Sequence, residues 1–282
     1  MSQVVPTLEP ARTVARRGQL IKARPVYPKA LTPAQRDALA DELYAVQKQI
    51  FGGVSRTGFR KYVIDSPAER TRIQVFRDGD TGAAVGFAAV HVFELHLDDG
   101  PLSLMRAEVG LAPGWRGRSA AAGLLLSEGL RLALRSPLRR ACFLACPVHP
   151  ASYLALSRSC SQVWPRPDTP TPAGIQHIMD RLDDQLGMER PDGAGDGVRK
   201  VGWVTRQGPP EARFWADHTD PRVRFYIDQN PGYTRGDGLL IVAPVDWTSV
   251  VEGAWSTVER MVQRSTRSLR NALRPVHNRI MG

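Results

Sequence analysis

The sequence predicts an α+β fold of three layers, in which a mixed, mostly antiparallel central sheet is flanked by helices. Three observations predict it. An amphipathic helix follows the N-terminal arm, three strands joined by tight turns come next, and the middle of the chain then alternates strand, basic turn, helix, strand and helix. The length of 282 residues and a hydrophobic content of 42% allow a full core.

The first helix is predicted from its own capping signals. Thr32 and Gln35 form a capping box around Pro33, which stands at the first helical position. Apolar residues then recur on one face as far as Ile50, and the glycine pair at 52–53 ends the helix.

A three-stranded antiparallel unit is predicted after this helix. Strands are expected over residues 71–77, 83–97 and 102–111. Turn sequences rich in Asp and Gly, at 78–82 and 98–101, join them.

The centre and the last part of the chain mix helices and strands. We expect these elements, in order: helix 119–135, strand 141–148, helix 150–159, helix 175–186, and strands 201–205, 222–227 and 239–245. Residues 1–30 are predicted to be an irregular basic arm, 31–250 one domain with its core at 31–165 and an extension at 166–250, and 251–282 a basic helical tail.

Composition narrows the class of protein. The chain has 38 Lys+Arg and 28 Asp+Glu, a formal charge of +10, and no apolar run approaches the roughly 20 residues of a membrane-spanning helix. The N-terminal segment has no apolar core typical of a secretion signal. The three cysteines, Cys142, Cys146 and Cys160, form no even disulfide framework, so a reducing, cytoplasmic location is expected.

A basic turn between the third strand and the next helix is the main candidate site. A helix N-terminus presents free N–H groups and the positive end of its dipole, where an anion such as a pyrophosphate can bind. Arg116 and Arg118 add charge, and Gly117 and the small residues after it allow close approach to the backbone. The alternative is that Ser119 only caps the helix and the alanines only allow close packing.

The residues of this turn resemble a known motif. Arg116, Gly117, Arg118, Ser119, Ala120 and Ala121 are similar to the acyl-CoA loop of the GNAT N-acetyltransferase superfamily, (Gln/Arg)-x-x-Gly-x-(Gly/Ala), with serine in place of the central glycine. The order of predicted elements over residues 30–165 is also similar. In many members a later helix begins with Asn and carries a Tyr seven residues on, where this chain has His149 and Leu156.

The resemblance implies a site and a reaction. Family members splay two parallel strands to form an acyl-donor cleft and bind pantetheine through the strand backbone and pyrophosphate on the loop. Here the implied donor-binding residues are Val109, Gly110, Leu111, Arg116, Gly117, Arg118, Ser119, Ala120 and Ala121. The implied activity is transfer of an acyl group from acyl-CoA or acyl carrier protein to an amine, by direct attack on the thioester.

Three residues are candidates for the proton transfers of such a reaction. Glu108 lies on the donor strand, where burial is expected to raise its pKa, or it pairs with Arg106 or another arginine. Tyr153 protonates the leaving thiolate, or its ring only packs. His149 is an acid/base group, or it caps the helix that begins at Pro150.

Other groups of polar residues are weaker candidates for a functional site. On strand 83–97, Glu94 and His96 share a face opposite to His91 and are either solvated or turned to substrate. Cys142, Cys146 and His149 lack a nearby fourth ligand, so we predict no metal site. The cysteines are expected to fill the core.

The extension after residue 165 suggests an enlarged site. Phe225, Tyr226 and Tyr233 are predicted to line an apolar channel in a closing strand pair. In architecture this is similar to the N-acyl amino acid synthases and acyl-homoserine-lactone synthases, which take long acyl chains from acyl carrier protein. That carrier is acidic, so we expect it to dock on the basic residues Arg116, Arg118, Arg139 and Arg140.

The C-terminal tail reads as a basic amphipathic helix over residues 257–282. It is expected to bind an anionic membrane surface reversibly, or to pack on its own body or on a second subunit. It lacks interleaved aromatics, so nucleic acid is not the expected partner. The competing function is a catalytically silent module that senses acyl-CoA or acts as a membrane-associated scaffold.

Overall fold

The computed structural model describes residues 18–116, 120–135, 140–160 and 162–245. Its longer elements are, in chain order, α1 (Pro33–Ile50), β3 (Arg70–Asp78), β4 (Ala84–Leu97), β5 (Gly100–Leu111), α3 (Ala122–Arg135), β6 (Arg140–Ala145), α4 (Pro150–Ser157), α5 (Ala173–Leu186), α6 (Pro209–Ala216), α7 (Pro221–Gln229) and β10 (Ile241–Pro244). The shorter ones are β1 (Leu20–Lys22), η1 (Pro28–Ala30), β2 (Phe51–Gly52), α2 (Arg56–Phe59), η2 (Arg60–Ile64), β7 (Val198–Lys200), β8 (Val204–Thr205), η3 (Pro231–Arg235) and β9 (Asp237–Leu239).

The main sheet has six strands in the order β1-β3-β4-β5-β6-β10. Its pairs are antiparallel except for β5 and β6, which run parallel. The predicted mixed, mostly antiparallel sheet with flanking helices is therefore confirmed, as are the two hairpins of the central unit.

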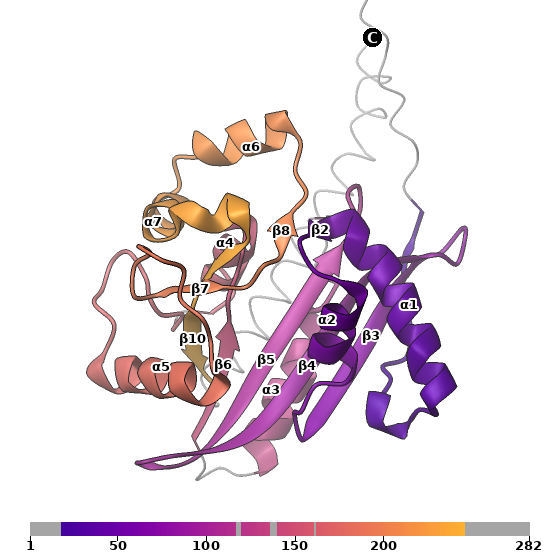
Figure 1. The fold of residues 1–282 in the computed structure, drawn as a ribbon, viewed down its shortest axis with the longest axis horizontal. Helices are drawn as coiled ribbons and strands as arrows, with labels where there is room; N and C mark the ends of the chain where they lie inside the picture. Colours follow the sequence, from indigo (N-terminus) through magenta and orange to yellow (C-terminus); the bar gives the residue numbers. More distant parts are fainter. Residues whose placement is uncertain (1–17, 117–119, 136–139, 161, 246–282) are drawn as a thin grey trace, which may run out of the picture.

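One face of the sheet is covered by α1 and α2, which lie in front of it in Figure 1. The helix α1 begins as predicted: the Thr32 side chain accepts from the Gln35 amide, and the Gln35 side chain accepts from the Thr32 amide. Its buried residues Leu43 and Ile50 pack against Phe87 and other residues of β3 and β4. This packing fixes the end of α1 beside the C-terminal half of β5.

The opposite face is covered by α3, which lies behind the sheet in Figure 1. Leu124 and Leu132 pack on β4 and β5. Glu128 on the same helix is buried and forms ion pairs with Arg70 and Arg72 of β3. A buried carboxylate needs such partners, so this cluster ties α3 to the sheet.

The C-terminal part of the described chain adds β10 to the sheet beside β6. Residues 222–227 were predicted as a strand, and this prediction is wrong: they belong to α7, because Asp220 caps the helix by accepting from the Arg222 amide and Pro221 occupies its first position. The rings of Phe225, Tyr226 and Tyr233 pack in one aromatic cluster with Tyr153, and the channel they were expected to line stays a prediction.

Smaller corrections concern ends of elements. The N-terminal arm contributes the strand β1, which pairs with β3, so it is not wholly irregular. The predicted strand 201–205 is reduced to β8, which pairs with β2. The helix predicted from residue 119 is described from Ala122.

Among the described residues, none of the helices has the length and apolar character needed to cross a bilayer. The predicted tail at 257–282 lies outside the described residues, as do the first 17 residues of the arm.

Thr32→Ala is expected to lower the free energy of unfolding by about 1 kcal/mol, because it removes the side chain that caps α1. Urea unfolding of both proteins measures this. Thr57→Ala is the matched control, since Thr57 is an exposed residue inside α2, whose cap is Ser55. Equal losses in the two variants would contradict the capping account.

Candidate active site

The central feature of the site is the divergence of β5 from β6. The strand β5 pairs with β4 without a break along its whole length, from Gly100 to Leu111. With β6 it pairs only from Leu102 to Arg106. Residues 107–111 therefore continue beyond the parallel pair, as the predicted splayed strands require.

The direction of the β5 backbone in this segment follows from the ladder on its other side. The Ala112 amide donates to the Val85 carbonyl of the β4 side at 2.8 Å. Because amide directions alternate along a strand, the amides of Ala107, Val109 and Leu111 point away from β4. They face the β6 side of the strand, where β6 no longer pairs with β5. Val109 is also exposed, with 43% of its surface accessible.

Gly110 lies where β5 meets the end of α1. A Cβ at this position would stand 2.9 Å from the Ile50 side chain. The atom it would meet is Cδ1, the far end of the Ile50 side chain, so a larger residue at this position would displace that side chain, and Gly110 serves the close packing of helix and strand.

Glu108 is buried beside the diverging segment and has two charged or polar partners. Its Oε1 lies 2.8 Å from Nε of Arg106, and its Oε2 lies 2.8 Å from Nε2 of His91 on β4. Both distances are those of ion pairs, but the N–H groups of Arg106 and His91 do not point at the carboxylate oxygens as a hydrogen bond requires. The sequence-based alternative of a pair with Arg106 is thus present in the structure.

The expected rise in the pKa of Glu108 is wrong. Burial does raise the pKa of this carboxyl, but the charge of Arg106 and the imidazole of His91 together outweigh burial, and the pKa lies below its usual value. The carboxylate is therefore ionised at neutral pH. It can receive a proton only from a group that becomes strongly acidic during a reaction.

The partners of Glu108 are themselves held from several elements. His91 Nδ1 lies 2.9 Å from the Thr71 hydroxyl of β3. The Arg106 guanidinium stacks 3.9 Å from the centre of the Tyr62 ring on η2, and its Nη2 donates to the Tyr62 carbonyl. One polar cluster, which we define as Thr71, His91, Arg106 and Glu108, thus crosses three strands under η2.

Arg116, the first residue of the predicted donor loop, is bound by the extension. Its Nη1 donates to both carboxylate oxygens of Glu211 on α6, at 2.9 and 3.0 Å, and its Nη2 donates to the Arg206 carbonyl. Gly117, Arg118 and Ser119 lie outside the described residues.

The two alanines of the loop have a packing role. Ala120 and Ala121 are buried among residues of α3, β4 and β5. This agrees with the close-packing alternative for these two side chains, while the donor role of their backbone stays a prediction.

Tyr153 lies on α4 and is fully buried. Its hydroxyl donates to the Pro165 carbonyl at 2.9 Å, and its ring packs against Phe225 and Tyr226. Burial raises the pKa of Tyr153 to about 12. The hydroxyl proton is thus already shared with a backbone carbonyl, and Tyr153 is absent from the polar cluster around Glu108.

His149 caps α4, one of its two predicted roles. Its Nδ1 accepts from the Ala151 amide, so the proton of the neutral ring stands on Nε2, which faces Oε1 of Gln207 at 3.1 Å. Burial lowers the pKa of His149, with Gln207 opposing the change. The ring is next to Trp215 of α6 and, like Tyr153, lies apart from Glu108.

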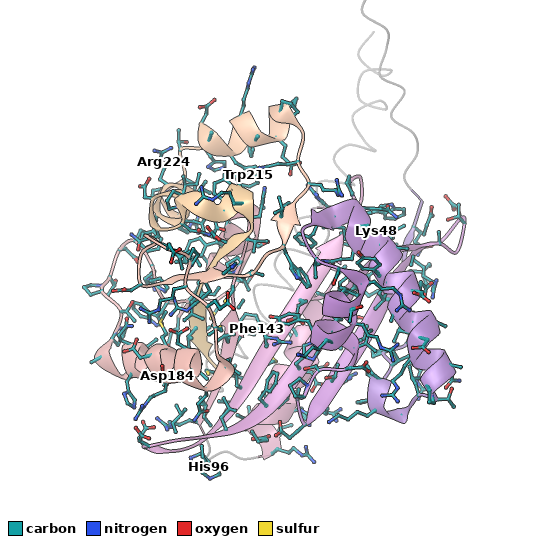
Figure 2. The ribbon with its side chains drawn as sticks, viewed as in Figure 1. Lys48, His96, Phe143, Asp184, Trp215 and Arg224 are labelled. Carbon is teal, nitrogen blue, oxygen red and sulfur yellow. The ribbon has the colours of Figure 1, made fainter. Side chains whose placement is uncertain are left out.

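The remaining candidates do not join this site. Glu94 and His96 are exposed, and Figure 2 shows His96 at the tip of the β4–β5 hairpin. Burial raises the pKa of both Cys142 and Cys146 to about 12, which keeps these thiols unreactive. Within the described ranges no group of three His, Cys, Asp or Glu side chains is arranged to hold a metal ion.

The basic residues expected to dock a carrier protein are separated. Arg140 lies opposite Leu102 at the start of β5 and pairs with Asp99, whereas Arg116 follows the end of β5. The nine residue steps between Leu102 and Leu111 span about 30 Å. These two arginines therefore do not form a single patch; Arg118 and Arg139 lie outside the described residues.

Sequence reasoning missed three partners: Thr71, Tyr62 and Glu211. It noticed His91 but not its contact with Glu108. The tight turn after Leu97 could have predicted this contact from the sequence. It pairs Leu97 with Gly100, and that register places His91 opposite Arg106 and Ala89 opposite Glu108. The contact between Arg116 and Glu211 joins residues 95 positions apart and has no local signal.

Known proteins resemble this chain in structure alone. Neither the family models nor the curated proteins contain a match. Similar solved structures include Arabidopsis thaliana NAA60 with acetyl-CoA, at 11% identity over 80% of this chain and 99% of that one, with a TM-score of 0.35. A GNAT-family acetyltransferase from Streptococcus pneumoniae is similar at 10% identity over 80% and 100% of the two chains, with a TM-score of 0.34.

A third similar structure is a predicted acetyltransferase of Clostridium acetobutylicum with acetyl-CoA, at 12% identity over 49% of this chain and 88% of that one, with a TM-score of 0.31. Structural neighbours thus include GNAT-family acetyltransferases. At these identities and TM-scores the similarities assign neither a family nor an activity to the chain.

Folding stability is expected to fall when pH drops from 7.5 to 5.5, partly because of His149. Its pKa is lower in the folded protein than the ordinary value near 6.5, so the folded state binds fewer protons than the unfolded state in this range. His149→Asn retains a good N-cap and removes the titration. Urea unfolding at both pH values should show a smaller drop for the variant; equal drops would contradict the assignment.

Proposed function

We propose that this protein is an N-acyltransferase that moves an acyl group from a thioester donor to an amine by direct attack. The single observation that carries the proposal is the segment 107–111 of β5: its backbone extends past β6, and the ionised carboxylate of Glu108 is buried beside it. The resemblance of the turn after β5 to an acyl-CoA loop supports the same donor.

The donor is held chiefly by backbone in this account. A pantetheine arm carries amides, which pair with strand edges as another strand does. The outward amides of Val109 and Leu111 and their carbonyls match that need. Arg116, whose guanidinium suits phosphate, would bind the pyrophosphate once separated from Glu211. Acyl-CoA is the proposed donor, and acyl carrier protein is its alternative.

Glu108 acts as the proton acceptor. Its Oε1 has two lone pairs and one charged partner, Arg106, so one lone pair is left for an amine or a water, whereas Oε2 is buried against His91. The attacking nitrogen becomes acidic as its bond to the acyl carbon forms. The carbon–sulfur bond then breaks, the proton passes to Glu108, and the thiolate takes a proton from solvent.

A silent acyl-CoA sensor is the second candidate function, and one observation favours it. The hydroxyl of Tyr153, the predicted acid for the leaving thiolate, already donates to the Pro165 carbonyl. Such a protein would bind the donor without turning it over.

Two measurements test the proposed function together. Melting temperatures are recorded with coenzyme A, acetyl-CoA, a long-chain acyl-CoA and an acylated carrier protein, because a ligand of the native state raises the melting temperature. Thiol release from the best donor is then followed across a panel of amines. We expect a rise and amine-dependent release, with Glu108→Gln lowering release by about 10² or more. A rise without release supports the sensor, and no rise rejects both.

Glu211→Gln is expected to tighten the binding of coenzyme A by roughly two- to fivefold, because a partly exposed ion pair that competes for Arg116 is worth up to about 1 kcal/mol. Calorimetric titration measures this. Glu189→Gln is the control, since Glu189 forms an exposed pair with Lys200. Unchanged affinity in Glu211→Gln would show that Arg116 does not meet the phosphates.

A further inference from the structure

A line of polar side chains crosses the sheet and ends at Glu108. Thr71 on β3, His91 on β4 and Glu108 on β5 project from the same face, and the register places Thr71 opposite His91. The two contacts along the line are 2.9 Å, from Thr71 Oγ1 to His91 Nδ1, and 2.8 Å, from His91 Nε2 to Glu108 Oε2.

We propose that His91 is a positioning residue for Glu108, and that Thr71 fixes the orientation of the His91 ring. This inference rests on the proposed function, in which Glu108 receives the proton of the attacking amine. His91 touches no reacting atom itself. It acts by holding one carboxylate oxygen while Arg106 holds the other.

The burial of these groups argues against a role in packing alone. His91 is fully buried and Thr71 nearly so. Apolar side chains at such positions stabilise a core at lower cost than polar ones that need partners. The neighbouring positions on the same faces of β3 and β4, Ile73 and Ala89, are apolar. The polar line is therefore confined to the strand positions that lead to Glu108.

The two ring nitrogens of His91 have different tasks. The hydroxyl of Thr71 can donate or accept, so it can satisfy Nδ1 in either tautomer. Nε2 is aimed at the carboxylate. A ring held at Nδ1 cannot turn, so the carboxylate of Glu108 is restrained from the side opposite to Arg106.

The titratable and charged groups that face Glu108 come from four places in the fold. Arg106 neighbours it on β5, His91 on β4, Tyr62 on η2, and Cys146 just after β6. His91 is one of the two groups that lower the pKa of Glu108 against the effect of burial. Its removal must therefore raise the pKa of Glu108.

The first experiment needs no activity. The protein is labelled with ¹³C at the Glu side-chain carboxyls, Glu108 is assigned by its loss in Glu108→Gln, and its titration is followed by NMR in wild type, His91→Leu, His91→Gln and Thr71→Val. We expect Glu108 to titrate about one pH unit higher or more in His91→Leu. His91→Gln, which keeps an N–H donor, should recover part of the change, and Thr71→Val should shift it less.

The second experiment uses turnover with acetyl-CoA and the amine that the panel identifies. Glu108 must be ionised to accept a proton, so the acid limb of kcat/KM should move to higher pH in His91→Leu, with kcat falling at least tenfold. Ile73→Val is the control for lost stability, because Ile73 is buried on the same face of β3. Its acid limb should follow that of wild type even where its melting temperature falls.

The outcomes separate the two proposals. An unchanged Glu108 titration in His91→Leu overturns the positioning role, whatever the activity; if that variant does not fold, an unchanged titration in both His91→Gln and Thr71→Val does the same. A shifted titration with no donor binding in wild type keeps the coupling of His91 to Glu108 and rejects the acyltransferase. A shifted titration with an unmoved acid limb shows that Glu108 is not the proton acceptor.

Discussion

The structure depends on the unequal pairing of β5 with its two neighbours. On the β4 side the ladder is complete, and it fixes the direction of every side chain and amide of β5. On the β6 side the ladder stops at Arg106, although β5 continues to Leu111. A strand with a complete ladder on one side and a partial one on the other is rigid enough to remain straight and still offers backbone groups to a ligand.

The helices support this unequal pairing from both faces. The end of α1 reaches β5 at Gly110, where a larger residue would displace the end of the Ile50 side chain. On the other face α3 is held by Glu128 through two arginines of β3. The extension after residue 165 joins the outer side of β6 through β10. It also reaches the end of α1 through β8, which pairs with β2, and the turn after β5 through Glu211, which holds Arg116.

The second constraint is a carboxylate buried beside the diverging segment. Burial alone would favour its neutral form, but Arg106 and His91 keep Glu108 ionised. Removing one partner of a buried ion pair costs about 3–5 kcal/mol in typical proteins, because the other charge is left buried without compensation. A group that is ionised, restrained and close to a free strand edge is suited to receive a proton from a bound amine.

Much of the fold could be predicted from the sequence because its signals are local. The capping box at Thr32 and the turns rich in Asp and Gly that bound the central strands act within a few residues. The strand predicted at 222–227 failed because its β-forming residues were weighed above the Asp-Pro signal of a helix start at Asp220 and Pro221.

The site was less predictable. Glu108 was found from its strand, but the direction of its pKa change depends on Arg106 and His91, whose positions need the strand register. The cost of burial is visible in the sequence, whereas the compensating charges are visible only in three dimensions. The contact of Arg116 with Glu211 likewise depends on how α6 folds back over the turn after β5.

The central claim is that the outward backbone of β5 binds the thioester donor. It is tested most directly by the amide signals of residues 107–111 in ¹⁵N NMR spectra as coenzyme A is added. The account predicts large shifts for the outward amides of Val109 and Leu111 and smaller ones for Glu108 and Gly110, whose amides face β4. Saturating coenzyme A that shifts none of these signals, or shifts inward and outward amides alike, would contradict it.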